Sequence, residues 1–264
     1  SRALILSYDD GPSQDRRLVR ELNDCGIKGT FHLNSGRLGE GAEWMTDLIG
    51  KAGSQVAAGE VQSLYAGHEV ASHSVNHPAF TSIDDEAIQQ EVNRDVETLS
   101  RLADYPVESQ AYPFGDFDDR VVASLAKTPV TGARTVQDTD NFDIPGDFLR
   151  WHPTIHHSKA LGLIDAFLAT DPSRPALFMI WGHSWELDGD KPDNNWSMVS
   201  EICRRLGGRD DIWYVTMGPF IRYLEAVRNL ELENGKWVNR SSQPVWIMAG
   251  KDPLRLSPER DAPD

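Results

Sequence analysis

Short apolar runs that alternate with longer amphipathic segments constrain the fold of this chain more than any other feature of its sequence. Runs of four to six apolar-rich residues predict buried strands, and the segments between them have the three-to-four-residue period of helices. This rhythm is typical of βα units around a parallel sheet. Eight strands are predicted, at residues 3–7, 28–33, 69–72, 109–112, 132–136, 148–151, 177–181 and 212–215.

The clearest predicted helix follows Ser82 and Asp84, where apolar residues recur every three or four positions and form one stripe. The stripe consists of Ile88, Val92, Val96, Leu99 and Leu102. Further helices are predicted at 16–24, 118–125, 158–169, 196–206 and 219–230. Residues 36–59 are irregular and rich in glycine, so we expect a long loop with one short helix there.

Eight strands with intervening helices favour an α/β fold. We expect a distorted (β/α) barrel of seven to eight parallel strands, because a closed barrel leaves no sheet edge exposed. After Leu230 the rhythm changes to short strand candidates at 237–238, 245–247 and 254–256, with a turn at 249–252. The expected organisation is a barrel over residues 1–230 and a small β-rich C-terminal extension over 231–264.

Composition restricts the classes of partner. The chain has 39% apolar and 25% charged residues, as an ordinary globular protein does. No apolar run approaches the roughly 20 residues that span a bilayer. Nucleic acid and anionic membranes need a basic face, which a net charge of -15 and a pI near 4.9 disfavour. We therefore expect neither partner, whereas neutral or cationic substrates remain open.

The cysteines and the N-terminus give little information on compartment. Cys25 and Cys203 are far apart and lack metal-site spacing, so one disulfide is possible but no disulfide framework is indicated. A strand-like segment begins at Ala3, and no signal peptide is expected in the chain as given. A cytoplasmic location and secretion after signal removal both stay open, as does the oligomeric state.

Two adjacent carboxylates follow the first predicted strand, in Asp9-Asp10-Gly11-Pro12. The active sites of (β/α) barrels lie at the carboxyl ends of the strands, and charge there is costly unless it has a use. An N-cap aspartate with a Gly-Pro turn would give the same pattern. Asp9 and Asp10 are therefore candidates for function, with this structural role as the alternative.

Two histidines four residues apart follow the third predicted strand. We expect His73 and His77 to present their rings on the same side of one helical turn, which Pro78 ends. Together with Asp10 they would form a site with three protein ligands and open positions, the pattern of catalytic zinc. Surface or capping histidines are the alternative.

A third histidine, His183, follows the predicted strand at 177–181 and lies between Trp181 and Trp185. Its position after a strand again favours function. A histidine packed among aromatic side chains is the alternative, because histidines are often partly buried without taking part in catalysis.

Four segments together resemble the motifs of the polysaccharide deacetylase family (NodB homology, carbohydrate esterase family 4). They are Ser7-Tyr8-Asp9-Asp10-Gly11-Pro12, His73-Ser74-Val75-Asn76-His77, Ala111-Tyr112-Pro113-Phe114-Gly115 and the strand that ends at His183. The resemblance covers about residues 3–230. The paired Asp and His-x-x-x-His motifs are fairly specific, and the later two are looser.

The resemblance implies a metal-dependent hydrolase of N-acetylated aminosugars. Asp10, His73 and His77 would bind one divalent ion, with Zn²⁺ expected first and Co²⁺, Ni²⁺ or Mn²⁺ as alternatives. Water activated by the metal would attack the acetyl carbonyl, with Asp9 as general base and His183 as general acid.

Substrate contacts are expected from aromatic residues near the strand ends. The backbone N–H of Phe114 would help hold the oxyanion. The substrate-binding candidates are Phe114, Tyr112, Trp151 and Trp185. Trp181 could also stack on a sugar face, and core packing is the alternative for Trp151, Trp181 and Trp185. His152, His156 and His157 are left outside the metal site.

The sequence departs from the family pattern in two places. Ala111 stands where the family usually has an Arg that orients the base, so Asp9 needs another partner. The Asp that usually accompanies the catalytic His is missing, and Glu186 or Asp188 could replace it. Two other functions stay open: deacylation of O-acetyl sugars or small N-acyl compounds on the same scaffold, and non-catalytic carbohydrate binding.

Overall fold

The computed structural model describes residues 2–189, 191–249 and 252–259. The chain divides into two compact units, Ser1–Met217 and Gly218–Asp264. The sequence places the start of the extension after Leu230, and that domain assignment stays a prediction.

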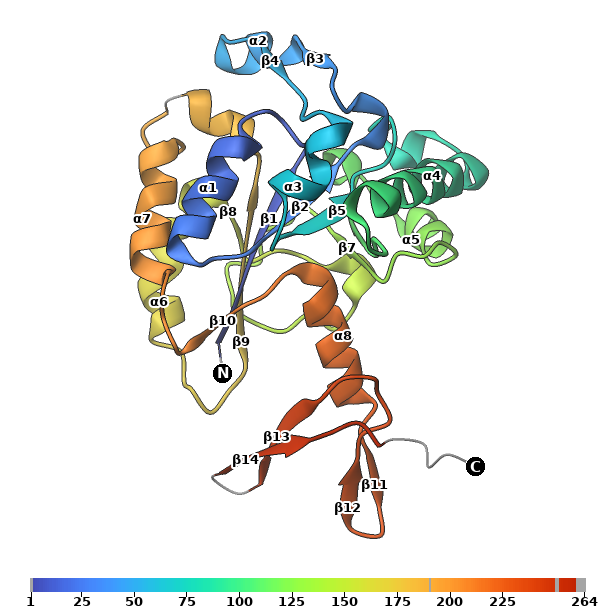
Figure 1. Cartoon of the computed structure of the whole chain (residues 1–264), viewed down its shortest axis with the longest axis vertical. Helices are drawn as coiled ribbons and strands as arrows, with labels where there is room; N and C mark the ends of the chain where they lie inside the picture. Colours follow the sequence, from blue (N-terminus) through green and yellow to red (C-terminus); the bar gives the residue numbers. More distant parts are fainter. Residues whose placement is uncertain (1, 190, 250–251, 260–264) are drawn as a thin grey trace. The chain divides into compact units, whose positions relative to one another are not determined.

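The first unit is built on a curled, parallel half-barrel sheet (Figure 1). Seven strands follow the order β7-β6-β5-β2-β1-β9-β8, and β10 pairs with the first residues of β1. They are β1 (Arg2–Asp9), β2 (Gly29–Leu33), β5 (Glu69–Ser72), β6 (Ser109–Ala111), β7 (Gly132–Arg134), β8 (Ile155–His156), β9 (Ala176–Gly182) and β10 (Ile212–Tyr214). The predicted α/β class and the distorted barrel are confirmed.

The central strands β1 and β9 form the middle of the core. Every residue of β1 from Ala3 to Asp9 is buried, and β9 is buried except at Trp181. Strands that are covered on both faces have near-continuous apolar sequences, which explains why the sequence predicts them well. Their carboxyl ends carry Asp9 and lead into His183.

Helices cover the sheet. They are α1 (Asp15–Cys25), α4 (Asp85–Ala103), α5 (Asp119–Leu125), α6 (Ile164–Leu168) and α7 (Trp196–Leu206). In α4 the predicted stripe is buried apart from Leu102, which is partly exposed. The side chain of Asp84 caps this helix by accepting a hydrogen bond from the Ala87 N–H at 2.8 Å. Figure 1 shows α1 and α7 side by side, and the two helices are in contact.

The segment between β2 and β5 is more ordered than a loop with one helix. It contains η1 (Ser35–Arg37), β3 (Gly41–Ala42), α2 (Trp44–Ile49), β4 (Gly53–Ser54), η2 (Ala58–Glu60) and α3 (Val61–Leu64). The strands β3 and β4 pair in antiparallel fashion and enclose α2. We call residues 36–59 the insertion.

One predicted strand is wrong. Residues 148–151 form the short helix η5 (Phe148–Arg150), and Trp151 makes a single parallel bridge to Arg134. The strand that pairs with β9 comes later, at β8. Pro153 lacks the N–H that a continuous strand would need, which separates the two pairings. Trp151 thus bonds to the edge strand β7, and Ile155, four residues later, begins the opposite edge strand β8.

Other elements are short turns of helix. They are η3 (Phe80–Ser82), η4 (Pro113–Gly115), η6 (His157–Leu163) and η7 (Ser184–Gly189). The predicted helix at 158–169 is therefore only partly correct, because a 3₁₀ segment that includes Gly162 precedes α6. Among the described residues, every helix is too short or too polar to traverse a lipid bilayer.

The C-terminal residues form antiparallel hairpins after α8 (Met217–Arg228). The pairs are β11 (Glu231–Glu233) with β12 (Lys236–Val238), and β13 (Val245–Ala249) with β14 (Asp252–Leu256). These hairpins confirm the predicted β appendage. The predicted turn at 249–252 includes residues 250 and 251, which lie outside the described residues.

Candidate active site and metal centre

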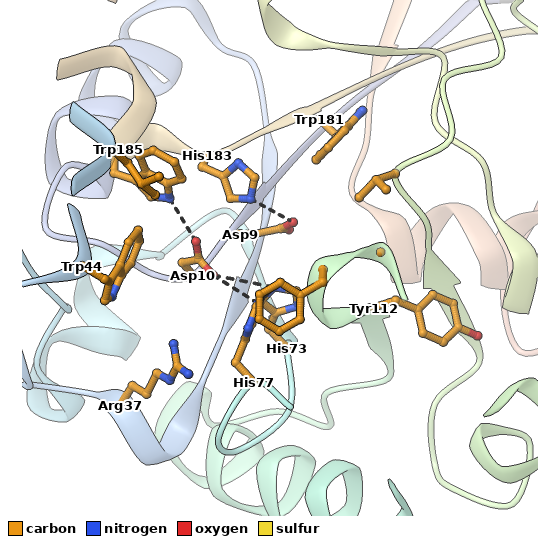
Figure 2. A pocket seen from close by; sticks show the side chains of 14 residues that line it. Asp9, Asp10, Arg37, Trp44, His73, His77, Tyr112, Trp181, His183 and Trp185 are labelled. Atoms are coloured by element: carbon orange, nitrogen blue, oxygen red, sulfur yellow. Dashed lines mark hydrogen bonds and ion pairs between the residues drawn. The ribbon is translucent and has the colours of Figure 1, made fainter. Parts of the chain in front are cut away.

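The candidate residues converge because they follow the carboxyl ends of parallel strands. Asp9 ends β1 and Asp10 follows it, His73 follows β5, and His183 follows β9. Neighbouring parallel strands present these ends at one edge of the sheet. Figure 2 shows the side chains directed into one pocket.

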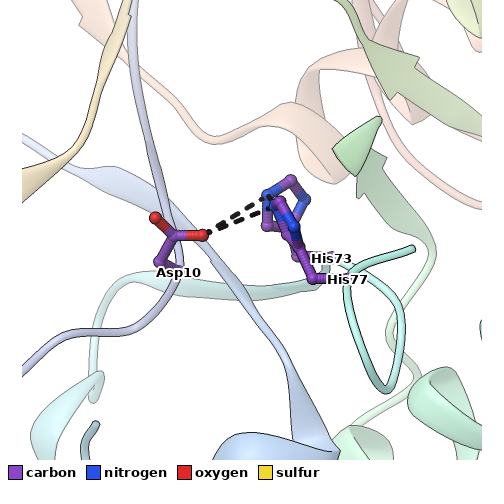
Figure 3. A group of neighbouring side chains, drawn as sticks. All are labelled: Asp10, His73 and His77. Carbon is purple, nitrogen blue, oxygen red and sulfur yellow. Dashed lines mark hydrogen bonds and ion pairs between the residues drawn. The ribbon is translucent and has the colours of Figure 1, made fainter. Parts of the chain in front are cut away.

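Asp10, His73 and His77 form a compact set of metal-ligand atoms (Figure 3). The Asp10 Oδ1 atom lies 3.7 Å from the Nε2 atom of each histidine, and the two Nε2 atoms are 3.1 Å apart. Ligand atoms around a tetrahedral zinc ion are roughly 3.4 Å from one another. The three residues therefore fit a small divalent ion with at least one open position.

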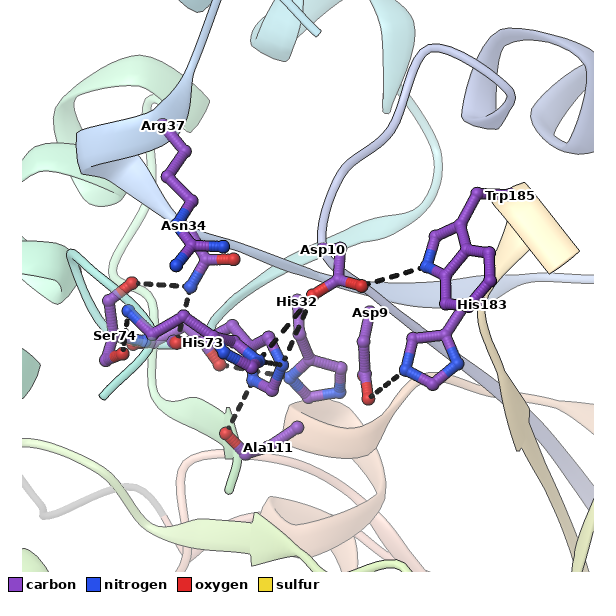
Figure 4. Close-up of polar contacts among 12 residues, drawn as sticks. Asp9, Asp10, His32, Asn34, Arg37, His73, Ser74, Ala111, His183 and Trp185 are labelled. Atoms are coloured by element: carbon purple, nitrogen blue, oxygen red, sulfur yellow. Dashed lines mark hydrogen bonds and ion pairs between the residues drawn. The ribbon is translucent and has the colours of Figure 1, made fainter. Parts of the chain in front are cut away.

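Hydrogen bonds with neighbouring residues orient two of the three possible ligands, His73 and Asp10 (Figure 4). His73 Nδ1 lies 2.8 Å from the Ala111 carbonyl oxygen, which only accepts, so the Nδ1–H donates and Nε2 is left with its lone pair. Trp185 Nε1 donates to Asp10 Oδ2 at 3.0 Å, which leaves Oδ1 facing the histidines. Burial lowers the pKa of His73, and burial together with His73 lowers that of His77 to about 3. Both rings are thus neutral, as metal ligands must be.

The ligand loops have unusual backbone geometry. Asp10, Ser74 and His77 have positive φ angles of 76°, 67° and 57°. Residues other than glycine rarely adopt this region, and each costs on the order of 1–3 kcal/mol. The predicted helical turn at 73–77 is therefore wrong, since left-handed residues interrupt it. Its loop is held instead by His77 N–H, which donates to Ser74 Oγ at 3.1 Å.

The side chain of Asp95, on α4, accepts hydrogen bonds from the residues that begin this loop. Its Oδ2 atom accepts from Ser72 Oγ at 2.6 Å and from the His73 N–H at 3.2 Å. Its Oδ1 atom accepts from the Ser35 N–H at 2.7 Å. The long helix α4 therefore fixes the position of His73 relative to Ser35, the residue that precedes the insertion.

Arg134, which the sequence analysis did not identify, supplies the partner that Asp9 needs. Both Asp9 carboxylate oxygens accept hydrogen bonds from Arg134 Nη2. Arg134 is 1% exposed, and its Nε and Nη1 atoms donate to Ser7 Oγ and the Thr135 carbonyl at 2.9 Å each. Burial would raise the pKa of Asp9, but Arg134, with help from His73, holds it well below its ordinary value. Asp9 is thus ionised throughout the neutral range.

Glu186 is the partner of His183. His183 Nδ1 lies 2.6 Å from Glu186 Oε1, and His183 Nε2 lies 3.8 Å from Asp9 Oδ2. Burial opposes the charged imidazolium, but Glu186 and the nearby carboxylates Asp10 and Asp9 raise the pKa of His183 to about 9. The ring is therefore protonated at neutral pH, with Nε2 directed toward Asp9.

Glu186 also joins a second group of possible metal ligands, with His156 and His157. Their Nε2 atoms lie 3.4 and 3.2 Å from Glu186 Oε2. The Ser158 backbone N–H donates to His156 Nδ1 at 3.4 Å, so Nδ1 accepts and the ring carries a hydrogen on Nε2. An Nε2–H donates to Glu186 and has no lone pair for an ion. This group is better explained as a support that fixes Glu186.

The pocket has a cavity of about 570 Å³, an ordinary size for a small-molecule site. Its lining contains all five predicted catalytic and metal-binding residues together with Tyr112, Phe114 and Trp185. The other lining residues are Arg37, Trp44, Leu48, Gly115, Val136 and Trp181. Trp151 does not line it, because this side chain is 1% exposed and packs against Phe148.

The N-terminal half of the chain is similar to known proteins. Residues 1–133 match a family model described as polysaccharide deacetylase. The chain is 30% identical over 153 residues to chitin deacetylase 1 of Cryptococcus neoformans, covering 53% of this chain and 29% of that protein. It is 25% identical over 115 residues to the peptidoglycan-N-acetylglucosamine deacetylase of Bacillus cereus, covering 43% and 36%. The aligned part is thus about a third of the length of each relative.

Solved structures share the fold. A putative polysaccharide deacetylase from Mycobacterium smegmatis superposes with a TM-score of 0.57 at 16% identity, covering 86% of this chain and 91% of that one. The peptidoglycan deacetylase PdaC from Bacillus subtilis gives a TM-score of 0.50 at 15% identity, covering 86% and 92%. At such identities the likeness concerns the fold alone.

Proposed function

Since this chain belongs to the polysaccharide deacetylase family, we propose that it is a metal-dependent hydrolase that removes N-acetyl groups from an aminosugar oligomer or polysaccharide. The observation that carries the proposal is the convergence of five residues on one pocket: the ligands Asp10, His73 and His77, and the proton-transfer pair Asp9 and His183. Zn²⁺ is the proposed metal, because two imidazoles and one carboxylate with an open position suit catalytic zinc.

The metal and the base would act on water. A divalent ion held by Asp10, His73 and His77 would supply Lewis acidity, which lowers the pKa of water and polarises an acyl oxygen. Asp9 accepts the proton of the attacking water, and Arg134 keeps its carboxylate ionised and fixed in orientation.

The oxyanion needs a hydrogen-bond donor, and the leaving amine needs a proton donor. Phe114 has a positive φ of 59° at the pocket wall, and we assign its backbone N–H to the oxyanion. An amine leaves readily only when it is protonated. His183, protonated at neutral pH and held by Glu186, donates that proton from Nε2.

Acetate release provides the test. Purified protein loaded with Zn²⁺ should release acetate from N-acetylglucosamine oligomers, and chelation or Asp9→Asn should abolish release. Acetylated xylan and small N-acetyl amides belong in the same panel, because an O-acetyl esterase or a small-molecule amidase would use the same metal, base and acid. Release from those compounds without release from any aminosugar would contradict the proposal. Tight sugar binding without turnover would instead support a non-catalytic relative.

A further inference from the structure

The pocket wall offers a substrate few free polar groups beyond the proposed catalytic and metal-binding residues. The Tyr112 hydroxyl donates to the Leu149 carbonyl at 2.8 Å, and the Trp181 indole N–H donates to Asp138 Oδ1 at 2.8 Å. The Trp185 N–H is already bonded to Asp10. These aromatic side chains therefore present mainly their ring surfaces to a ligand.

Arg37 is the exception. It is the only arginine or lysine among the described residues that line the pocket, and Figure 2 shows its guanidinium directed toward the cavity below Asp10. No carboxylate of the described residues forms an ion pair with it within 4 Å, and its Nη2 atom donates a hydrogen bond to the Asn76 carbonyl at 2.8 Å. A guanidinium has five N–H donors, so most remain available.

Arg37 is held in place by its neighbours. Asn76, which accepts its hydrogen bond, is itself fixed by Glu91 through a backbone contact of 2.8 Å and a side-chain contact of 2.7 Å. The Gly36 N–H donates to the Val75 carbonyl at 3.1 Å, which ties η1 to the loop of His77. The cation is thus preorganised beside the metal ligands, which lowers the entropic cost of binding an anion.

We propose that Arg37 binds a carboxylate of the substrate, so that the pocket prefers N-acetylated compounds with an acidic substituent near the acetamido group. This inference rests on the proposed function and names its substrate class. A planar guanidinium binds carboxylate through two parallel hydrogen bonds, which a neutral sugar hydroxyl does not match. The net charge of -15 favours neutral or cationic substrates for the surface as a whole, and Arg37 reverses that preference locally.

N-Acetylmuramic acid and N-acetylglucosamine form a matched pair of probes, because the first carries an additional lactyl ether with a carboxylate. The acidic sugar should be deacetylated with a kcat/KM roughly tenfold higher, about the effect of one good charge-assisted contact. Arg37→Gln should remove most of that ratio, and Arg37→Lys should retain part of it. Arg101→Gln, on an exposed position of α4 outside the pocket, is the control that leaves the ratio unchanged. N-Acetylated amino acids form a further arm, which distinguishes a small acidic compound from an acidic sugar.

Equal kcat/KM values for both sugars, or an equal loss on both in Arg37→Gln, would overturn the inference and assign Arg37 a structural role. Failure to hydrolyse any N-acetylated compound would refute the proposed function instead. Calorimetry on the zinc-loaded Asp9→Asn protein separates these cases without turnover. This protein should bind N-acetylmuramic acid more tightly than N-acetylglucosamine, and adding Arg37→Gln should remove the difference. Equal affinities would also overturn the carboxylate site.

An independent observation concerns the two cysteines. Cys25, the last residue of α1, and Cys203, in α7, have Sγ atoms 2.7 Å apart, and both thiols are partly exposed. The backbones are also close there: a Cβ added at Gly207 would lie 2.9 Å from the Cys25 Cβ. We infer that this pair is a site of oxidative cross-linking between the two helices that follow the Asp10 and His183 loops.

Thiol–disulfide exchange with oxidised glutathione supplies the oxidant. The two thiols lose two protons and two electrons, a disulfide forms, and oxidised glutathione is reduced to two thiols. Because the bond would close a long loop, the midpoint of thermal unfolding should rise by roughly 5–15 °C over the dithiothreitol-treated protein. Cys25→Ser and Cys203→Ser should show no such rise. Thiols that stay open to alkylation after oxidation, or a cross-linked protein with an unchanged midpoint, would overturn the inference.

Discussion

Arg134 reaches Asp9 from the far edge of the sheet, and both side chains are buried. We expect Arg134→Met to lower kcat by about 10²–10³, because the proposed base Asp9 loses the guanidinium nitrogen that bonds both its oxygens, and an uncompensated charge remains. Loss of one member of a buried pair also costs about 3–5 kcal/mol of unfolding free energy. Arg134→Lys keeps the charge but not the contacts of Nε and Nη1 to Ser7 and Thr135, which orient the group, so it should recover stability more than kcat. Urea unfolding and acetate release measure both effects, and an active Arg134→Met enzyme would refute the role of the pair.

The pKa of His183 governs the alkaline side of the pH profile. With its pKa raised to about 9, the ring is protonated below that pH, and kcat should fall as pH rises through it. The folded-state pKa exceeds the unfolded value near 6.5, so the charged pair stabilises the fold fully below that value and this contribution disappears as pH rises through about 9.

Glu186→Gln should move the alkaline limb of kcat to lower pH by roughly 1–3 units, the usual effect of removing an adjacent opposite charge. Asp188→Asn is the matched control, because Asp188 lies on the same segment but bonds to Trp196 and Gln14. A pH-rate profile of each variant makes the comparison. An alkaline limb at the same pH in Glu186→Gln and Asp188→Asn would show that Glu186 does not raise the pKa of His183.

At the scale of elements, the insertion supplies a wall of the pocket. Trp44 of α2 packs edge-on against Trp185, with ring centroids 5.3 Å apart, and both line the cavity. Trp44→Ala should raise KM roughly 2–10-fold with little change in kcat, since an aromatic contact contributes about 0.5–1.5 kcal/mol. Trp213→Ala, on β10 and outside the pocket lining, is the control. A loss in kcat alone would indicate that the insertion acts on the chemistry rather than on binding.

Elements with strong periodic patterns could be predicted from the sequence. The continuous apolar run of β1 and the stripe of α4 each identify one structure. The prediction of a strand at 148–151 was wrong because a short apolar run has no period that distinguishes a strand from a 3₁₀ turn. The prediction of a helical turn at 73–77 was wrong because residues other than glycine that adopt left-handed backbone angles leave no clear signal in the sequence.

The catalytic and metal residues could be proposed from motifs, but their partners could not. Arg134 and Asp9 are 125 positions apart. Their strands, β7 and β1, are separated by three others in the sheet, so only its curl brings the two side chains together. The signal available was an arginine inside the predicted strand at 132–136, where a buried charge needs a partner. Glu186 was one of two candidates, and geometry selected it.

For the whole molecule, the metal should act as a cross-link between strand ends. An ion held by Asp10, His73 and His77 binds the folded state alone, so zinc at a thousand times its dissociation constant adds about 4 kcal/mol of stability. Chelation should therefore lower the midpoint of thermal unfolding, and His73→Ala should remove both the bound zinc and this difference. His156→Ala should retain one zinc per chain by elemental analysis. Loss of zinc in that variant would assign the metal to the second cluster.

The contact between Arg134 and Asp9 bears on the order in which the site is completed during synthesis. Residues 1–133 contain all three proposed metal ligands, whereas Arg134 and His183 come later in the chain. A nascent chain emerges from its N-terminus, so the ligands leave the ribosome before the partner of the base and before the acid. The ion binds only the folded state, and β1, which leads into Asp10, pairs with β9. The ligands therefore have to wait for β9, and with it for Arg134, so metal capture and the tuning of the base are expected in one folding step.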